Sequence, residues 1–119
     1  MSKGVRGHPM KISRIEDTDR GWFIGNFEKA AFQTDACEVS YKFHKKGEHW
    51  PLHYQEKIIE INLMVSGEMI MQGQKLVSGD IFIIYPYEIA DPEFLTDCGV
   101  VCVKLPGIQN DKVVVERVK

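Results

Sequence analysis

Short apolar stretches separated by turn residues constrain the fold of this chain more than any other feature of its sequence. Apolar residues at the three-and-four spacing of an amphipathic helix are hard to find. Instead, alternating or β-branched runs are interrupted by Gly, Pro, Asp and Asn, as in an all-β sandwich or barrel. We therefore predict strands near residues 11–15, 22–26, 36–44, 58–65, 68–72, 75–77, 81–85, 93–96, 99–105 and 112–118.

The strand predicted over 36–44 shows the alternation most clearly. From residue 37 onwards, apolar side chains at odd positions alternate with polar side chains at even positions. Because successive side chains of a strand point to opposite faces, we expect the odd face, with Tyr41 and Phe43, to be buried. The even face, with Lys42 and His44, is expected to be exposed to water.

The strand predicted over 58–65 has a different pattern. Glu60 and Asn62 share one face with Met64, while the other face is wholly apolar. A strand that is apolar on one side and carries a single carboxylate on the other is expected to be covered on both sides. A second copy of the chain would cover the apolar outer face, so the pattern predicts a homodimer.

Charge and the length of the apolar runs argue against several classes of function. The net charge is −2, and no basic run is interleaved with aromatic residues, so nothing indicates nucleic-acid binding. The longest apolar runs are far too short to cross a bilayer, and residues 1–10 lack the apolar segment of a signal peptide. The three cysteines fit free thiols in a reducing, cytoplasmic compartment. We expect a flexible arm over 1–10 and one domain over 11–119.

Polar residues at fixed spacing carry the chemical information. Gly47 is followed after five residues by His53-x-Gln55, after four more by Glu60, and after six more by Gly67. This segment resembles the first motif of the cupin superfamily, which reads Gly, five residues, His-x-His, three or four residues, Glu, six residues, Gly. Every spacing agrees, and Gln55 replaces the second histidine. Residues 53 and 55 point to one side of a strand, and Glu60 returns on the next segment to face them.

The second cupin motif is only partly present. Gly79 begins the Gly-Asp pair and the apolar strand that the family shows there. Tyr87 then stands where the family has glycine, and Ala90 stands where it has its last metal-binding histidine. Asp91 is a candidate replacement ligand, provided that a loop over 86–92 turns it inward.

The resemblance implies an all-β fold, the single-domain cupin jelly-roll β-barrel or double-stranded β-helix, with a pocket inside. It also implies a site for one divalent metal ion (Fe, Mn, Ni or Zn) at His53, Gln55, Glu60 and Asp91, and no organic cofactor. Whether a metal is bound stays open, because two imidazoles of the family's ligand set are missing. Further residues are candidates for the pocket lining, although core packing explains several of them equally well: Tyr41, Trp50, Asn62, Met64 and Tyr87.

Three functions are compatible with such a pocket. The first is an enzyme for a small polar metabolite such as a sugar or sugar derivative. In it His53 is the base of an isomerase- or epimerase-like, non-redox reaction, and Glu60 orients it or shares the proton. Dioxygenase chemistry is less favoured, because it usually needs two histidines and a carboxylate. The second function is a non-catalytic module that binds a small ligand, and the third is a scaffold in which the motif is a relic.

Overall fold

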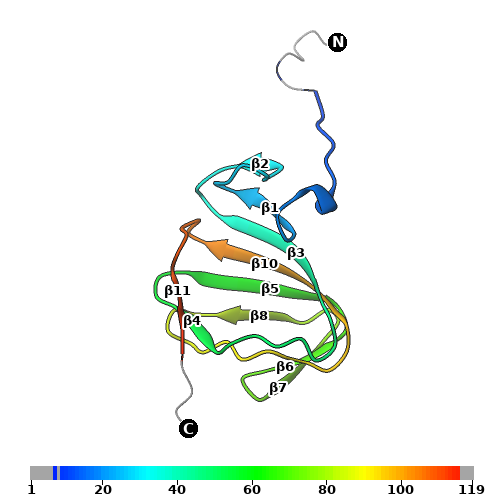
Figure 1. Cartoon of the computed structure of the whole chain (residues 1–119), viewed down its shortest axis with the longest axis vertical. Coiled ribbons are helices and arrows are strands. Elements are labelled where there is room, and N and C mark those ends of the chain that lie inside the picture. The colour runs from blue at the N-terminus through cyan, green and yellow to red at the C-terminus, as the bar shows by residue number, and fades with distance from the viewer. Residues whose placement is uncertain (1–6, 8, 116–119) are drawn as a thin grey trace.

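The chain folds almost entirely into β-strands, as seen in a computed structural model that describes residue 7 and residues 9–115 (Figure 1). One short 3₁₀ helix, η1 (Ile15–Asp17), precedes the strands. The strands are β1 (Trp22–Gly25), β2 (Phe32–Gln33), β3 (Glu38–His44), β4 (His53–Gln55), β5 (Ile59–Ser66), β6 (Glu68–Met71), β7 (Gln74–Val77), β8 (Ile81–Ile84), β9 (Glu93–Phe94), β10 (Cys98–Leu105) and β11 (Lys112–Val114).

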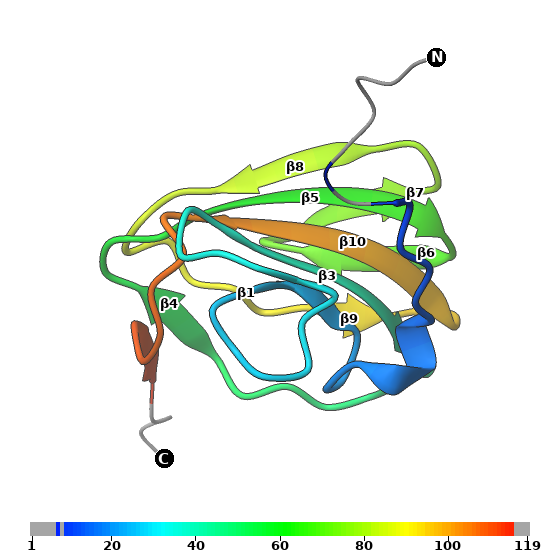
Figure 2. The same cartoon turned by 90° about the horizontal axis from the view of Figure 1, so that it is seen from above.

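These strands form one large sheet and two small ones within the described residues. The large sheet has the order β2-β1-β3-β10-β5-β8, and the small sheets have the orders β11-β4 and β7-β6-β9. Viewed from above, β4 and β11 lie on the opposite side of the molecule from β5 and β8 (Figure 2). The prediction of an all-β fold is confirmed.

Several predicted strand positions need correction. The segment 11–15 is exposed and leads into η1 instead of joining a sheet, because alternation alone does not supply a pairing partner. Strand β2 was not predicted, since it is too short to show a period, whereas β4 was expected only from the motif at residues 53–55. Strand β11 ends at Val114, and residues 116–118 of that prediction lie outside the described part of the chain. The predicted arm over 1–10 also lies mostly outside it.

The register of the large sheet aligns polar side chains across three strands. Cys102 of β10 lies opposite Ser40 of β3 on one side and Asn62 of β5 on the other. Two residues further on, Lys104 lies opposite Glu38 and Glu60. Directly paired residues project from the same face of a sheet. These two rows therefore place polar and charged groups on the inner face.

The face prediction for β3 was wrong. Ser40, on the face expected to be wet, is 0% exposed, whereas Phe43, on the face expected to be buried, is 68% exposed. The reason is that the interior at β3 is a polar cavity, so its polar face points inward. For β5 the predicted division is confirmed in direction, since Asn62 and Met64 are buried while Leu63 is exposed.

An apolar cluster fills the part of the interior near β6 and β9. It consists of Met64, Met69, Phe94, Cys98 and Val100, all buried, with Trp50, Met71, Leu76 and Phe82 packed against it. Full burial of such side chains contributes roughly 1.5–3 kcal/mol each. The remaining part of the interior is left open and polar.

The last glycine of the first motif is required by close packing. Gly67 has a φ of +89°, which disfavours any residue with a Cβ. A Cβ there would also lie 2.2 Å from the carbonyl oxygen of Asp97, an impossible contact. The turn between β5 and β6 therefore depends on this glycine. Among the described residues, no helix is long and apolar enough to span a membrane.

Candidate functional site

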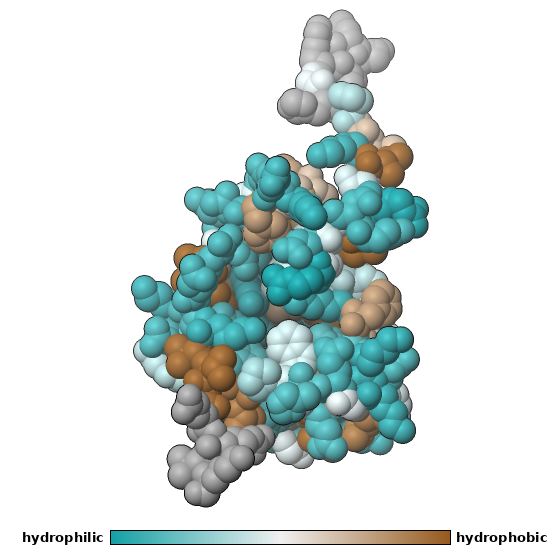
Figure 3. Space-filling view, viewed as in Figure 1, coloured by the Kyte–Doolittle hydropathy of each residue, from teal (hydrophilic) through white to brown (hydrophobic). Residues whose placement is uncertain are grey.

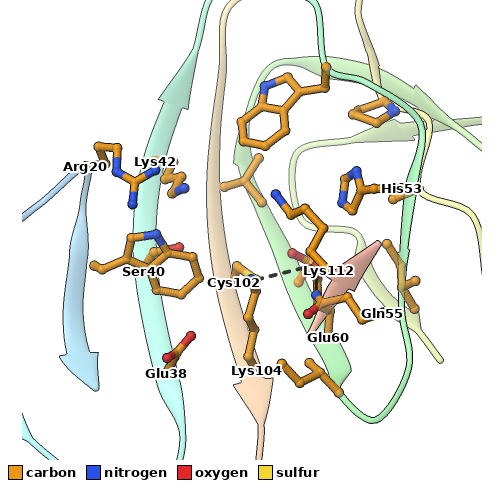
Figure 4. Close-up of a pocket in the computed structure, with 18 of the residues that line it drawn as sticks. Arg20, Glu38, Ser40, Lys42, His53, Gln55, Glu60, Cys102, Lys104 and Lys112 are labelled. Atoms are coloured by element: carbon orange, nitrogen blue, oxygen red, sulfur yellow. Dashed lines mark hydrogen bonds between the residues drawn. The ribbon is translucent and has the colours of Figure 1, made fainter. Parts of the chain in front are cut away.

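A cavity of about 630 Å³ lies between the inner face of the large sheet and strands β4 and β11. This volume is within the range of roughly 300–1,000 Å³ that is usual for small-molecule sites. The residues lining it come from strands far apart in the sequence, including β3, β4, β5, β10 and β11 (Figure 4). The site therefore exists only in the folded chain.

His53 is held on β4 in one defined tautomer. Its Nδ1 lies 3.0 Å from the carbonyl oxygen of Pro51. A carbonyl can only accept a hydrogen bond, so Nδ1 must carry the proton, and in the neutral ring Nε2 keeps a free lone pair. Burial lowers the pKa of His53, and the positive charge of Lys112 lowers it further, while Glu60 opposes the shift. His53 is thus a neutral imidazole near pH 7, with Nε2 available as a base or ligand.

Glu60 is held by two neighbours. The side-chain amide of Gln55 donates a hydrogen bond to Oε2 of Glu60, and the thiol of Cys102 lies 3.7 Å from Oε1 (Figure 4). Burial and the negative charge of Glu60 raise the pKa of the Cys102 thiol. Cys102 therefore stays protonated and donates to Glu60, and it does not serve as a thiolate nucleophile.

The second motif meets the first at Ala90. The backbone N–H of Ala90 donates to the carbonyl oxygen of His53 at 2.7 Å, and Ala90 lines the cavity. A histidine at this position would share the site with His53, but the methyl group of Ala90 offers no donor. Residue 90 therefore lines the cavity, as the motif resemblance implies, but alanine cannot supply the metal-binding nitrogen that a histidine would supply there.

Asp91 is not among the residues that line the cavity. Its Oδ1 accepts the backbone N–H of Gln72 at 2.8 Å, in the turn between β6 and β7. Tyr87 also lies outside: it is 65% exposed, and its ring stacks on Tyr54 with centroids 5.6 Å apart. The φ of Tyr87 is +69°, so the backbone keeps the left-handed conformation that suits the glycine of the family motif.

The structure brings some of the expected lining residues to the cavity and not others. Asn62 and Trp50 line it, as do His53, Gln55 and Glu60. Met64 is fully buried in the apolar cluster instead. Tyr41 belongs to the opposite face of β3, where its ring lies 4.7 Å from that of Phe43.

The donor set does not fit a firmly held metal ion. Within residue 7 and residues 9–115, no three His, Cys, Asp or Glu side chains lie close enough together to ligate one ion. Of the motif residues at the cavity, His53 and Glu60 are the strong donors, Gln55 already donates to Glu60, and nearby Cys102 is a neutral thiol. Structural and catalytic sites usually present at least three protein ligands.

Sequence reasoning missed the three lysines of the cavity, Lys42, Lys104 and Lys112. Lys42 was assigned to a wet face, and the other two lie in strands whose orientation the sequence did not reveal. The sequence signal that could have located Lys42 was the alternation in β3. It places residues 38, 40 and 42 on one face, and this face is the inner one that Glu60 and Asn62 share. Only the strand register makes that relation visible.

His44 was also expected at the surface, and its side chain is mostly buried at the rim. Its Nδ1 lies 2.8 Å from Oε2 of Glu48, and the same oxygen accepts the indole N–H of Trp50 at 2.6 Å. The ring of His44 stacks on Phe94 with centroids 4.4 Å apart. Glu48 thereby fixes Trp50 at the edge of the cavity.

Comparison with models of known protein families and with curated proteins gave no match. Solved structures do match. A Klebsiella pneumoniae protein with a double-stranded β-helix domain aligns with a TM-score of 0.63 at 21% identity, over 71% of this chain and 74% of that one. The DMSP lyase DddQ from Ruegeria pomeroyi aligns with a TM-score of 0.65 at 18% identity, over 79% of this chain and 49% of that one. KdgF from a Halomonas species aligns with a TM-score of 0.58 at 20% identity, over 65% and 74%.

These similarities are too distant in sequence to transfer an activity, and they agree on the architecture. Together with the strand order, they assign the chain a double-stranded β-helix fold.

Proposed function

We propose that this protein is an enzyme that moves a proton on a small polar metabolite held in the cavity. A sugar or sugar derivative carrying a carbonyl group fits the size and the polar lining. The reaction class is non-redox isomerisation or epimerisation. One fold neighbour, DddQ, is a lyase, which supports the view that this architecture can hold an active site.

The observation that carries the proposal is the state of His53. Its Nδ1 proton is committed to Pro51, its pKa is lowered, and its ring lines the cavity. A neutral imidazole with a free Nε2 can remove a proton from a carbon next to a carbonyl and return it on the same or the neighbouring atom. His53 is accordingly the general base.

Glu60 supports this step electrostatically. Its negative charge raises the pKa of His53 against the effects of burial and Lys112, so it stabilises the imidazolium formed when His53 takes the proton. The hydrogen bonds from Gln55 and Cys102 keep the carboxylate in place. Glu60 is therefore assigned the role of stabilising the charged base.

Hydrogen exchange with solvent tests the reaction class without knowledge of the substrate. A panel of aldoses, ketoses and 2-oxo acids is incubated with the protein in D₂O, and deuterium next to the carbonyl group is followed by NMR. The proposal expects catalysed exchange for at least one class of compound. Exchange at the background rate for every compound would contradict it.

A binding module without catalysis is the second candidate function. It is favoured by the hydrogen bond from Gln55 to Glu60, which occupies one oxygen of the carboxylate. Ligand-induced stabilisation against heat, in the absence of any solvent exchange, would favour this candidate over the enzyme.

We also propose that the outer face of β5 and β8 binds a second copy of the chain. Strand β8 is the last strand of the large sheet, so one of its edges has no strand partner within the described residues. The apolar side chains beside this edge are exposed, among them Leu63, Val65, Ile81 and Ile83. Pairing of two edges in a two-fold arrangement would cover both. Light scattering tests this, and a monomer at high concentration would contradict it.

The cysteines support a reducing compartment such as the cytoplasm. Cys37, Cys98 and Cys102 are all free, and Cys98 and Cys102 lie on the same strand. Free thiols of this kind persist most easily where disulfides are kept reduced.

A further inference from the structure

Three lysine ammonium groups are gathered around two tryptophan rings of the cavity. The Nζ atoms of Lys42 and Lys104 lie 4.8 and 4.9 Å from the centre of the Trp22 ring. Lys42 also lies 5.7 Å from the ring of Trp50, and Lys112 lies 5.1 Å from it. The three lysines come from β3, β10 and β11, and Figure 4 shows them around the same opening as His53 and Glu60. Lys42 is thus near both rings.

The protein supplies no close counter-charge to these three groups. No described carboxylate lies within 4.0 Å of any of the three ammonium nitrogens. Of the cavity acids, Glu60 accepts hydrogen bonds from Gln55 and Cys102. Burial raises the pKa of Glu38, the positive charge of Lys104 lowers it in part, and the two groups form no ion pair. Near Trp22 and Trp50, the three ammonium groups are therefore left without an ion-pair partner among the described residues.

The two remaining acids of the cavity lining are engaged elsewhere. Oδ2 of Asp111 accepts three backbone N–H groups in the loop before β5, at 2.8–3.0 Å. Asp19 lies 3.3 Å from the guanidinium of its neighbour Arg20. Neither acid forms an ion pair with one of the three lysines.

Two buried neutral groups beside the lysines also lack partners. The hydroxyl of Ser40 and the amide nitrogen of Asn62 make no hydrogen bond within the described structure, although both residues are buried and line the cavity. A buried polar group without a partner costs roughly 1–3 kcal/mol. The amide nitrogen can only donate, so it requires an acceptor. Both groups flank Cys102, in the row next to Lys104.

We propose that the ligand of this cavity is a small anion, an acid or phosphate ester that also carries hydroxyl or carbonyl oxygens. Its acidic group is held by Lys42, Lys104 and Lys112, and its neutral oxygens accept from Ser40 and Asn62. This inference rests on the proposed function for the reacting end, which faces His53, and it adds the substrate class. The free ammonium groups repel one another, and burial together with Arg20 and Lys104 lowers the pKa of Lys42 to about 8. A bound anion would relieve that repulsion.

The alternative is that the lysines only cover the tryptophan rings. Cation–π contacts contribute about 0.5–1 kcal/mol at exposed sites. They would explain why the lysine side chains lie over the rings, but not why two buried hydrogen-bonding groups beside them have no partner. A ligand with acceptor oxygens accounts for both observations.

Calorimetric titration with matched probes tests the proposal. D-glucuronate and D-glucose 6-phosphate carry a carboxylate and a phosphate on the same ring, and D-glucose is their neutral counterpart. We expect at least one acidic probe to bind at least tenfold more tightly than D-glucose at low ionic strength. The acidic probe that binds more tightly assigns the anion as a carboxylate or a phosphate.

Methionine substitutions locate the site, because methionine keeps much of the side-chain length and removes the charge. Lys42→Met and Lys112→Met are each expected to weaken binding of the acidic probe about tenfold, while Lys42→Arg retains it. Lys75→Met is the matched control, since Lys75 is exposed on β7 and pairs with Glu68 at 3.3 Å. Circular dichroism confirms that each variant is folded.

Two results would overturn the inference. One is equal affinity for D-glucose and both acidic probes, or no binding of either acid. The other is unchanged binding of an acid by both folded methionine variants. Titration measures ligand binding, whereas solvent exchange measures proton transfer. Failure of the proposed ligand class can therefore be distinguished from failure of the proposed reaction.

Discussion

The two faces of the sheet formed by β3, β10 and β5 differ in a way that reverses the usual relation between polarity and burial. On the inner face, Glu38 and Ser40 are buried, while on the outer face Phe43 and Leu63 are exposed. Burying polar groups costs free energy unless they find partners. Exposed apolar side chains are individually unremarkable, but Leu63 lies opposite Ile81, which is exposed on the edge strand β8. This contrast supports the proposals that the inner face binds a polar ligand and that the outer face binds a second copy of the chain.

The largest effect is expected from removing the base on the cavity side. His53→Gln keeps a hydrogen-bonding side chain and loses the basic Nε2. Loss of a general base lowers a rate by about 10²–10⁴-fold, and we expect this fall in the solvent-exchange rate. Binding of the acidic probe should change less than about threefold. If the fold reduction in the solvent-exchange rate is no larger than the fold reduction in affinity, His53 contributes to binding and is not the general base.

The next largest effect contrasts neighbouring residues on opposite faces of β5. Met64 is 0% exposed in the apolar cluster, and Leu63 is 38% exposed on the outer face. Met64→Ala should lower the free energy of unfolding by about 2–5 kcal/mol because it leaves a cavity. Leu63→Ala should lower it by less than about 1 kcal/mol, measured by urea unfolding at low protein concentration. Equal losses of unfolding free energy in the two variants would contradict the burial of Met64 and the exposure of Leu63.

A tenfold effect of pH is expected at Lys42. Burial, Arg20, Lys104 and Lys112 lower its pKa to about 8, and nearby Cys102 stays a neutral thiol. An ammonium group is charged below its pKa and neutral above it, so anion binding should weaken as the pH rises through 8. We expect up to about tenfold weaker binding at pH 9 than at pH 7. Lys42→Arg should remove this dependence, because arginine stays charged. An identical pH profile in that variant would assign the titration to another group.

The smallest effect is expected from chelation. Because no three potential metal ligands lie close together among the described residues, treatment of the protein with EDTA should shift its melting temperature by less than about 1 °C. The double variant Gln55→His, Ala90→His is the positive control. It restores the two imidazoles of the cupin pattern next to His53 and should gain stabilisation by Ni²⁺. A large loss of stability of the wild type in EDTA would contradict the donor set described above.

The sequence was sufficient for the architecture and for part of the site. Motif spacing located His53, Gln55, Glu60 and residue 90, because cupin spacing follows from strand and turn lengths that the sequence shows directly. It also gave the division of β5 into two faces. Asp91 was proposed as a ligand on its proximity in sequence, and the structure shows it capping a turn.

The orientation of β3 could not be predicted because alternation gives two faces without saying which is inside. The usual assumption, apolar side inward, fails where the interior is a binding cavity. The lysines of β10 and β11 were missed for a related reason: their meeting with Lys42 depends on register between strands about 60 residues apart, as in the pairing of Val100 with Lys42. Long-range register of this kind is not encoded in any local pattern.

A crystal structure of the protein with whichever acidic probe binds more tightly would show directly where the acidic group is held. We expect it among the ammonium groups of Lys42, Lys104 and Lys112, with another oxygen or a carbon of the ligand next to Nε2 of His53. A ligand bound outside the sheet, or bound inside with its acidic group turned away from the three lysines, would contradict this expectation.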